Sequence, residues 1–246
     1  MGRWSGFVGA IGIGLALVGC RPGPPPRILC LGDSITLGTT RGGERDGVDP
    51  QGGYAGRLGR LLDGRAEVRC RAAGGATAAM WLASSDSPRG RVLAATLGKV
   101  GPPLPPAASP QARVVDTVLD ADRPDVVVVL LGTNDLALSR DQPEDVAVEE
   151  VLGQLHAVRA AIIAHGARPL VATVLPSGRP TAPRAAALNA RLRAEMPEVV
   201  DLAADFEAAG GVRLLGDDVH PNAAGHEVLA GLVADTLVRR GFVAAR

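Results

Sequence analysis

A serine at the end of a predicted buried strand is the first residue of this sequence with an evident chemical use. It lies in the segment Gly32-Asp33-Ser34-Ile35-Thr36, directly after the apolar run 27–31, which has the length and composition of a strand buried in a sheet. A tight turn there lifts a small hydroxyl clear of the sheet, where it can act as a nucleophile once a base removes its proton. Because Gly-Asp-Ser is also a common turn sequence, the prediction depends on the rest of the chain supplying a base and an oxyanion hole.

The base is predicted to be His220. Of the four histidines, only this one lies in a predicted loop with an acid three residues before it, Asp217. That step allows the Asp217 carboxylate to hold one imidazole nitrogen and leaves the other for Ser34. The remaining histidines are expected to be surface or packing side chains: His156, His165 and His226.

Two further residues could stabilise the oxyanion that acyl transfer generates. Gly75 has no side chain to obstruct its N–H and follows a predicted strand, and Asn134 offers a side-chain amide after another strand. Taken singly, each is as well explained as a turn glycine or a capping asparagine. Together with Ser34 and His220, they favour catalysis.

The elements that must position these groups follow from the hydrophobic pattern. Five strands are predicted, at 27–31, 66–71, 125–131, 170–174 and 199–202, and the main helices at 55–62, 144–165, 181–195 and 223–239. Strands that alternate with helices predict a parallel sheet with helices on both faces, and such sheets bind ligands at the carboxyl ends of their strands. Ser34, Gly75 and Asn134 follow the first three strands and 217–220 follows the fifth, so we expect all four groups at one rim.

At this point the sequence resembles the SGNH (GDSL) hydrolases. The resemblance rests on Gly32-Asp33-Ser34-Ile35-Thr36, Gly75, Gly132-Thr133-Asn134-Asp135 and Asp217-Asp218-Val219-His220-Pro221-Asn222, in the order of the family's four blocks. It implies a flavodoxin-like three-layer α/β/α sandwich, here with a five-stranded parallel sheet. It also implies Ser34 as nucleophile, His220 as base, Asp217 as its orienting acid, and an oxyanion hole made by the Ser34 and Gly75 N–H groups and the Asn134 amide.

One departure from the family is visible in the second block. That block often reads Asn-x-x-x-Ser-Gly, whereas the segment 71–75 lacks both the Asn and the Ser and keeps only the glycine. Because the glycine is kept, this departure concerns the support of the loop and not the catalytic groups. The larger α/β-hydrolases are excluded because the chain contains no Gly-x-Ser-x-Gly. No cofactor is expected, and the widely spaced cysteines predict no metal site.

A weaker resemblance bears on the substrate. Residues 52–58, Gly-Gly-Tyr-Ala-Gly-Arg-Leu, are similar to a Gly-Gly-Tyr-Arg segment of secreted carbohydrate acetylesterases. Asp33, Tyr54 and Trp81 are candidate substrate contacts, although core packing explains the two aromatic residues equally well. We expect an esterase that removes short acyl groups, with acetyl favoured, from carbohydrate or small esters. A lysophospholipase or thioesterase, and an acyltransferase, remain alternatives.

Composition narrows the function further. The 246 residues carry 26 basic and 26 acidic side chains and only 2% aromatic residues, a balance that argues against a nucleic-acid-binding surface. The length suits one domain, predicted over 27–246, in which 84–110 forms an irregular surface insertion that could be helical around 92–97. Cys30 and Cys70 fall in predicted strands and could pair in an oxidising compartment, although buried free thiols are favoured.

The N-terminus has the pattern of a bacterial lipoprotein signal. A short basic start and an apolar run at 7–18 end in Leu17-Val18-Gly19-Cys20, and the run is too short to span a bilayer. We therefore expect a signal peptide at 1–19, lipidation of Cys20, a Pro-rich tether at 20–26 and a location in the cell envelope, at the outer membrane in a Gram-negative host. The alternative is a secretory signal in which Cys20 is incidental.

Overall fold

The protein is built on a parallel sheet, and the computed structural model describes residues 23–41 and 47–245. The strand order is β4-β1-β5-β6, and every pair is parallel. The strands are β1 (Arg27–Gly32), β4 (Glu67–Ala72), β5 (Val126–Leu130) and β6 (Arg168–Val171). Because side chains alternate along a strand, β1, β5 and β6 each contribute to two cores. Leu29 and Leu31 of β1 enter one core, and Ile28 and Cys30 enter the other.

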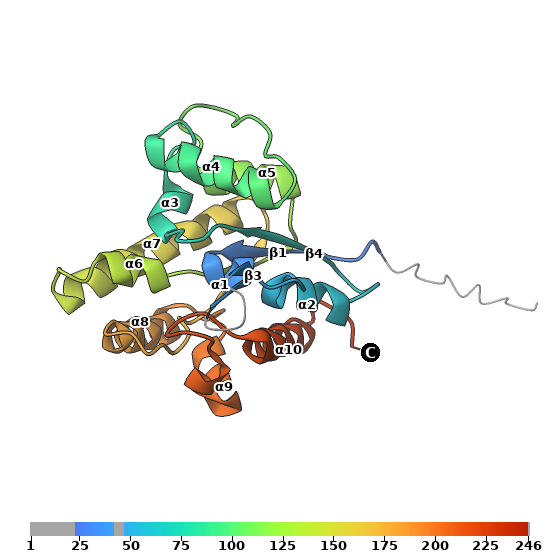
Figure 1. Ribbon diagram of the computed structural model, residues 1–246. Helices are drawn as coiled ribbons and strands as arrows, with labels where there is room; N and C mark the ends of the chain where they lie inside the picture. Colours follow the sequence, from blue (N-terminus) through green and yellow to red (C-terminus); the bar gives the residue numbers. More distant parts are fainter. Residues whose placement is uncertain (1–22, 42–46, 246) are drawn as a thin grey trace, which may run out of the picture.

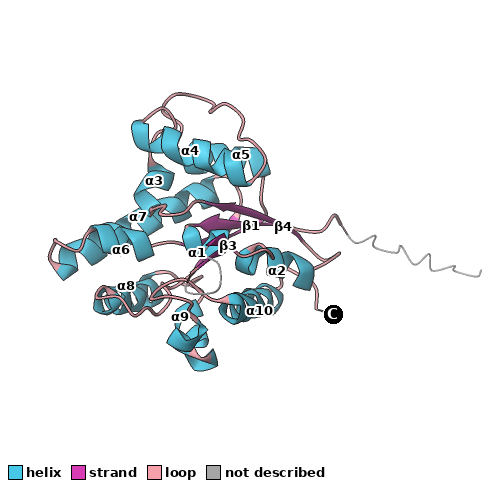
Figure 2. Ribbon diagram, viewed as in Figure 1, coloured by secondary structure: helices cyan, strands magenta, loops and turns pink. Residues whose placement is uncertain are grey.

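Helices cover both faces of this sheet (Figures 1 and 2). One face packs against α2 (Gly53–Leu61), α9 (Leu202–Ala209) and α10 (Ala223–Arg239). The other packs against α3 (Ala78–Leu82), α4 (Pro88–Val100), α5 (Val114–Asp122), α7 (Glu144–Ala164) and α8 (Ala182–Glu195). The short helices α1 (Ser34–Leu37) and α6 (Thr133–Leu138) begin at the carboxyl ends of β1 and β5. The predicted three-layer α/β/α fold is confirmed.

The sheet has four described strands, one fewer than predicted. The expected fifth strand at 199–202 is reduced to a single bridge between Val200 and Ala172. Its length is limited by Asp201, whose side chain accepts a hydrogen bond from the Ala204 N–H and so caps α9. The chain therefore turns into a helix before a ladder can form.

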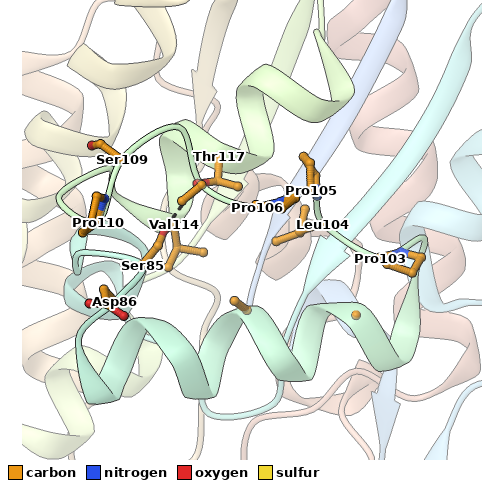
Figure 3. A pocket seen from close by; sticks show the side chains of 13 residues that line it. Ser85, Asp86, Pro103, Leu104, Pro105, Pro106, Ser109, Pro110, Val114 and Thr117 are labelled. Atoms are coloured by element: carbon orange, nitrogen blue, oxygen red, sulfur yellow. Dashed lines mark hydrogen bonds between the residues drawn. The ribbon is translucent and has the colours of Figure 1, made fainter.

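The segment 84–110 is more ordered than predicted. It contains the 13-residue helix α4, which is capped by Ser87 and has Pro88 in its first turn. Leu93 and Leu97 of this helix are fully buried in the core. The following loop crosses over α4 and α5 and leaves a pocket of about 560 Å³ lined by Leu104 and several prolines (Figure 3). None of the predicted catalytic side chains lines this pocket.

The two cysteines of the sheet are free thiols. Cys30 and Cys70 are direct partners in the register of β1 and β4, and no disulfide joins them. Burial raises the pKa of the Cys70 thiol to about 12 and raises that of Cys30 further. The predicted signal peptide and Cys20 lie outside the described residues. Within 23–41 and 47–245, no helix combines the length and apolar character needed to cross a membrane.

Candidate active site

The turn after β1 places Ser34 at the start of α1. Asp33 caps this helix by accepting the Ile35 N–H at 2.9 Å. Gly32 is required before it, because a Cβ there would overlap the Thr36 side chain and come within 2.7 Å of the Leu130 carbonyl oxygen. Ser34 remains partly exposed while Asp33 and Thr36 are buried, so the turn presents one hydroxyl to solvent.

Ser34, His220 and Asp217 form a hydrogen-bonded chain. His220 Nε2 lies 3.0 Å from Ser34 Oγ, and His220 Nδ1 lies 2.8 Å from Asp217 Oδ2. The structure therefore brings together three side chains that sequence reasoning grouped, although Ser34 and His220 are 186 positions apart. With Nδ1 donating to the carboxylate, Nε2 is left as an acceptor for the serine proton.

The Asp217 carboxylate is kept ionised by hydrogen bonds from its own loop. Asp217 Oδ1 accepts the His220 N–H at 2.6 Å and the Val219 N–H at 2.8 Å. Burial acts to raise the pKa of the Asp217 carboxyl, but these bonds and the imidazole outweigh it and lower the pKa to about 2. Asp217 is thus an anion at neutral pH, fixed in one orientation by two backbone donors. Its neighbour Asp218 is exposed, and the carboxylate bonded to the imidazole Nδ1 is that of Asp217.

Asn134 and the Gly75 turn lie beside this chain. Asn134 is in the first turn of α6, after Gly132, whose φ of +115° is readily adopted only by glycine. Its Nδ2 donates to Asp33 Oδ2 at 3.2 Å and to the Ala76 carbonyl at 3.0 Å. Gly75, with φ of +73°, is exposed and precedes Ala76. Asn134 therefore bridges the turn that carries Ser34 and the turn that carries Gly75.

The three residues predicted as candidate substrate contacts are buried, so the structure contradicts that prediction. Asp33 is 1% exposed, and Tyr54 and Trp81 are 0% exposed. Tyr54 lies on α2 with its hydroxyl 3.4 Å from Thr36 Oγ1, behind the turn that carries Ser34. Trp81 lies on α3 and packs in the core. Neither ring can stack on a sugar, because the apolar residues of the domain cover both.

Sequence reasoning missed Asp135 as part of the site. Its Oδ1 accepts the Ala78 N–H at 2.9 Å, at the start of α3 and shortly after Gly75. Burial raises the pKa of Asp135 to about 6. The signal was present in the segment 132–135, where an acid follows Asn134 directly. In the described part of the chain, no group of three or more His, Cys, Asp or Glu side chains could hold a metal ion.

The chain matches a family model over most of its length. The model is that of the GDSL-like lipase/acylhydrolase family, and it covers residues 30–228. This range includes all the side chains of the hydrogen-bonded chain and Asn134. No curated protein matches the sequence significantly.

Solved structures share the fold at low sequence identity. A lipase/acylhydrolase from Enterococcus faecalis aligns with a TM-score of 0.57 at 19% identity, covering 90% of this chain and 98% of its own. An acetylxylan esterase from Geobacillus stearothermophilus aligns with a TM-score of 0.56 at 22% identity, covering 86% and 94%. A protein of Desulfitobacterium hafniense assigned to the lipolytic G-D-S-L family aligns with a TM-score of 0.57 at 14% identity, covering 86% and 99%.

Proposed function

Since the chain belongs to the GDSL-like lipase/acylhydrolase family and is a carboxylic ester hydrolase, we propose that it uses Ser34 as nucleophile and removes short acyl groups from carbohydrate or small esters. The observation that carries the catalytic assignment is the chain of two hydrogen bonds, at 3.0 and 2.8 Å, that joins Ser34 through His220 to Asp217. The distances are those at which a base can remove a serine proton.

The reaction proceeds in two acyl transfers. Neutral His220 takes the Ser34 proton at Nε2 as Oγ attacks the ester carbonyl, and it returns this proton to the departing alcohol. Water then attacks the acyl-serine through the same base, which releases the carboxylic acid and restores Ser34. Asp217 stabilises the imidazolium that forms in each step.

The oxyanion of each tetrahedral intermediate is stabilised by three donors. They are the Ser34 N–H, the Gly75 N–H and the Asn134 amide. Support comes from the exposed, side-chain-free Gly75 and from the Asn134 amide, whose nitrogen lies 3.2 Å from the carboxylate of Asp33, the residue before the nucleophile. Donors of this kind act on charge that exists only in the transition state.

The small acyl group and the polar alcohol are inferred from the rim. At the end of β4 and in the loop after it, residues 72–76 have no side chain larger than a methyl group. This segment therefore offers no apolar wall for a long acyl chain. Gly178 donates its N–H to the Asp218 carbonyl at 2.9 Å. The polar residues on either side of it, Ser177 and Arg179, therefore lie beside the loop that carries Asp217 and His220. The acetylxylan esterase among the structural relatives acts on an ester of this kind.

One observation favours the alternative of a lipid acyl hydrolase. Leu138, at the end of α6 and four residues after Asn134, is 76% exposed. An apolar side chain at that position could contact the chain of a lysophospholipid or an acyl thioester. An acyltransferase would use the same catalytic residues with a sugar in place of water.

A series of p-nitrophenyl esters with acyl chains of two to twelve carbons tests the proposal. We expect kcat/KM to be highest for the acetyl ester and to fall steadily with chain length, with no turnover in Ser34→Ala. A maximum at eight carbons or more would assign the lipid alternative instead. Formation of an acetylated sugar when an acceptor sugar is added would assign the transferase.

The cellular location is also part of the proposal. Cys20 carries a lipid anchor, and the residues after it form a short tether that holds the domain close to the bilayer. The support is the signal pattern that ends in Gly19-Cys20, together with the exposed Pro24 and Pro25 that precede β1. The enzyme then works in the cell envelope on the outer side of the cytoplasmic membrane.

A further inference from the structure

Two buried carboxylates lie next to the proposed oxyanion donors, and the reaction steps use neither. Asp33 is 1% exposed and Asp135 is 5% exposed. Burial raises the pKa of Asp33 to about 7, with the negative charge of Asp135 adding to it, and burial raises the pKa of Asp135 to about 6. Keeping two acids in an apolar interior is unfavourable. Their hydrogen bonds show what these side chains contribute.

Asp33 joins the nucleophile turn to Asn134. Its Oδ1 accepts the Ile35 N–H at 2.9 Å, and its Oδ2 accepts from Asn134 Nδ2 at 3.2 Å. An ionised carboxylate can only accept hydrogen bonds, and an amide can donate only from its nitrogen end. The Asp33 anion therefore disfavours the flipped amide, in which Oδ1 would face the carboxylate.

This orientation decides whether Asn134 can serve the reaction. Only the Nδ2 end of the amide can stabilise an oxyanion, whereas the Oδ1 end would repel it. Asp33 holds one of the two amide hydrogens, and the other is directed at the Ala76 carbonyl, 3.0 Å from Nδ2. We infer that this second hydrogen is the one shared with an oxyanion, because the first is held by an anion.

Asp135 supports the turn that carries Gly75, as Asp33 supports the turn that carries Ser34. Its Oδ1 accepts the N–H of Ala78, the first residue of α3, and so fixes the segment that follows Gly75. Its Oδ2 is buried and has no hydrogen-bond partner in the described structure. The departure from the family's second block, which lacks its Asn and Ser here, leaves this turn in need of such support.

We propose that Asp33 is a positioning residue of the oxyanion hole, which acts by holding the Asn134 amide with its nitrogen toward the reaction centre. The inference rests on the proposed function, because it requires Asn134 to be an oxyanion donor. It also replaces the expectation from sequence that Asp33 contacts substrate.

Asp33→Asn removes the anion and keeps a side chain that caps helices well. It sets an NH₂ group against Asn134 Nδ2 or lets the amide flip, so we expect kcat for p-nitrophenyl acetate to fall about 10- to 100-fold while KM stays within about twofold. In the Asn134→Ala background, the same substitution should lower kcat by no more than about twofold, because there is no amide left to position.

Two further variants keep the result interpretable. Asp201→Asn makes the same chemical change at the cap of α9, where Asp201 accepts the Ala204 N–H, and should leave kcat unchanged. Asp33→Ser retains a capping hydroxyl but is too short to reach Asn134. We expect Asp33→Ser to show the same loss of kcat as Asp33→Asn. It replaces Asp33→Asn in the test if circular dichroism shows that Asp33→Asn does not fold.

The outcomes separate the inference from the function on which it depends. Equal losses of kcat from Asp33→Asn in the wild-type and Asn134→Ala backgrounds would overturn the positioning role and leave the esterase assignment intact. A rise in KM with constant kcat would also overturn it, because Asp33 would then act in substrate binding. If Asn134→Ala alone leaves kcat unchanged, both the oxyanion assignment and the inference fail.

Discussion

At the scale of single residues, the site contains acids with opposite environments. Asp217 is surrounded by donors, which lower its pKa to about 2. Asp33 is buried and accepts hydrogen bonds from the Ile35 N–H and the Asn134 amide, and burial raises its pKa to about 7. Asp217 is therefore stable as an anion, whereas ionised Asp33 costs folding free energy. If the Asp33 anion positions Asn134, the ionised form that does so is less stable than the protonated form.

This cost predicts a pH dependence of stability. The pKa of Asp33 is higher in the folded chain than in the unfolded chain, about 7 against 3.8. The folded state therefore binds more protons between these values, and its stability falls as the pH rises from about 4 to about 7. In Asp33→Asn this loss is absent, so the free energy of unfolding of the variant should gain a few kcal/mol on wild type between pH 4.5 and pH 8.

Urea unfolding at a series of pH values measures this difference. Asp135 contributes a loss in the same direction in both proteins, since its pKa is also raised. Its loss is smaller in Asp33→Asn, because the two carboxylates repel each other, and this adds to the expected gain of the variant. If the free energy of unfolding changes with pH in the same way in wild type and Asp33→Asn, the pKa of Asp33 is not raised by folding and the prediction is contradicted.

Residue types and spacing were sufficient to predict the hydrogen-bonded chain but not burial. His220 could be chosen because Asp217 lies three residues earlier in the same loop, a relation that is local in sequence. The exposure of Tyr54 and Trp81 depends on which helix face meets the sheet, and that is decided by packing across the whole domain. Asp135 was missed for a related reason: its partner, the Ala78 N–H, lies 57 positions away.

At the scale of elements, two glycines control the approach of α2 to the nucleophile turn. A Cβ on Gly38, at the end of α1, would lie 2.6 Å from the backbone nitrogen of Gly53 at the start of α2. The Gly-Gly-Tyr segment thus acts through contact with the nucleophile turn, with Tyr54 reaching Thr36 behind it. Arg57 of the same helix forms a buried ion pair with Asp49.

Gly38→Ala should therefore destabilise the domain more than backbone strain alone explains. Gly64→Ala is the matched control, because Gly38 and Gly64 both have positive φ, +86° and +69°, but a Cβ on Gly64 meets nothing within 4 Å. We expect about 1–2 kcal/mol for Gly64→Ala from the left-handed backbone, and at least about 2 kcal/mol more for Gly38→Ala from the clash. Urea unfolding at pH 7 gives both values, and equal losses would contradict the close approach of α1 and α2.

The elements with strong hydrophobic periods were predicted well, and the exceptions have local causes. The last helix, predicted at 223–239, has those bounds as α10. Helix α4 was obscured because Pro88, Gly90 and Gly98 weaken its pattern, although its buried Leu93 and Leu97 hold it to the core. Helix α9 was missed because the predicted strand at 199–202 includes both its cap, Asp201, and its first residue, Leu202.

At the scale of the whole molecule, the point where the chain enters the sheet and the site lie at opposite ends of β1. The chain enters β1 from Pro24 to Pro26, whereas Ser34 follows the carboxyl end of the same strand. A tether at Cys20 would therefore hold the enzyme from the amino end of β1. The carboxyl end, where Ser34 lies, would remain free to bind a polymer or a small ester.

The anchor predicts a lipidated full-length protein. Metabolic labelling with an alkyne fatty acid should mark the wild type and place it in the membrane fraction, while Cys20→Ala remains unlabelled. The reason is that the apolar run at 7–18 is too short to remain as a span. Wild type without label and recovered in the soluble fraction would leave Cys20 as part of an ordinary secretory signal.

The central claim is that one serine, Ser34, is made nucleophilic by His220. A fluorophosphonate probe tests it most directly, since only an activated hydroxyl displaces fluoride from phosphorus. Mass spectrometry of the tryptic peptide 28–41 should show one probe group on Ser34 in wild type, and no group on that peptide in Ser34→Ala or in a folded His220→Ala variant. A wild-type enzyme that hydrolyses p-nitrophenyl acetate but carries the probe elsewhere, or is labelled equally in His220→Ala, would contradict the account.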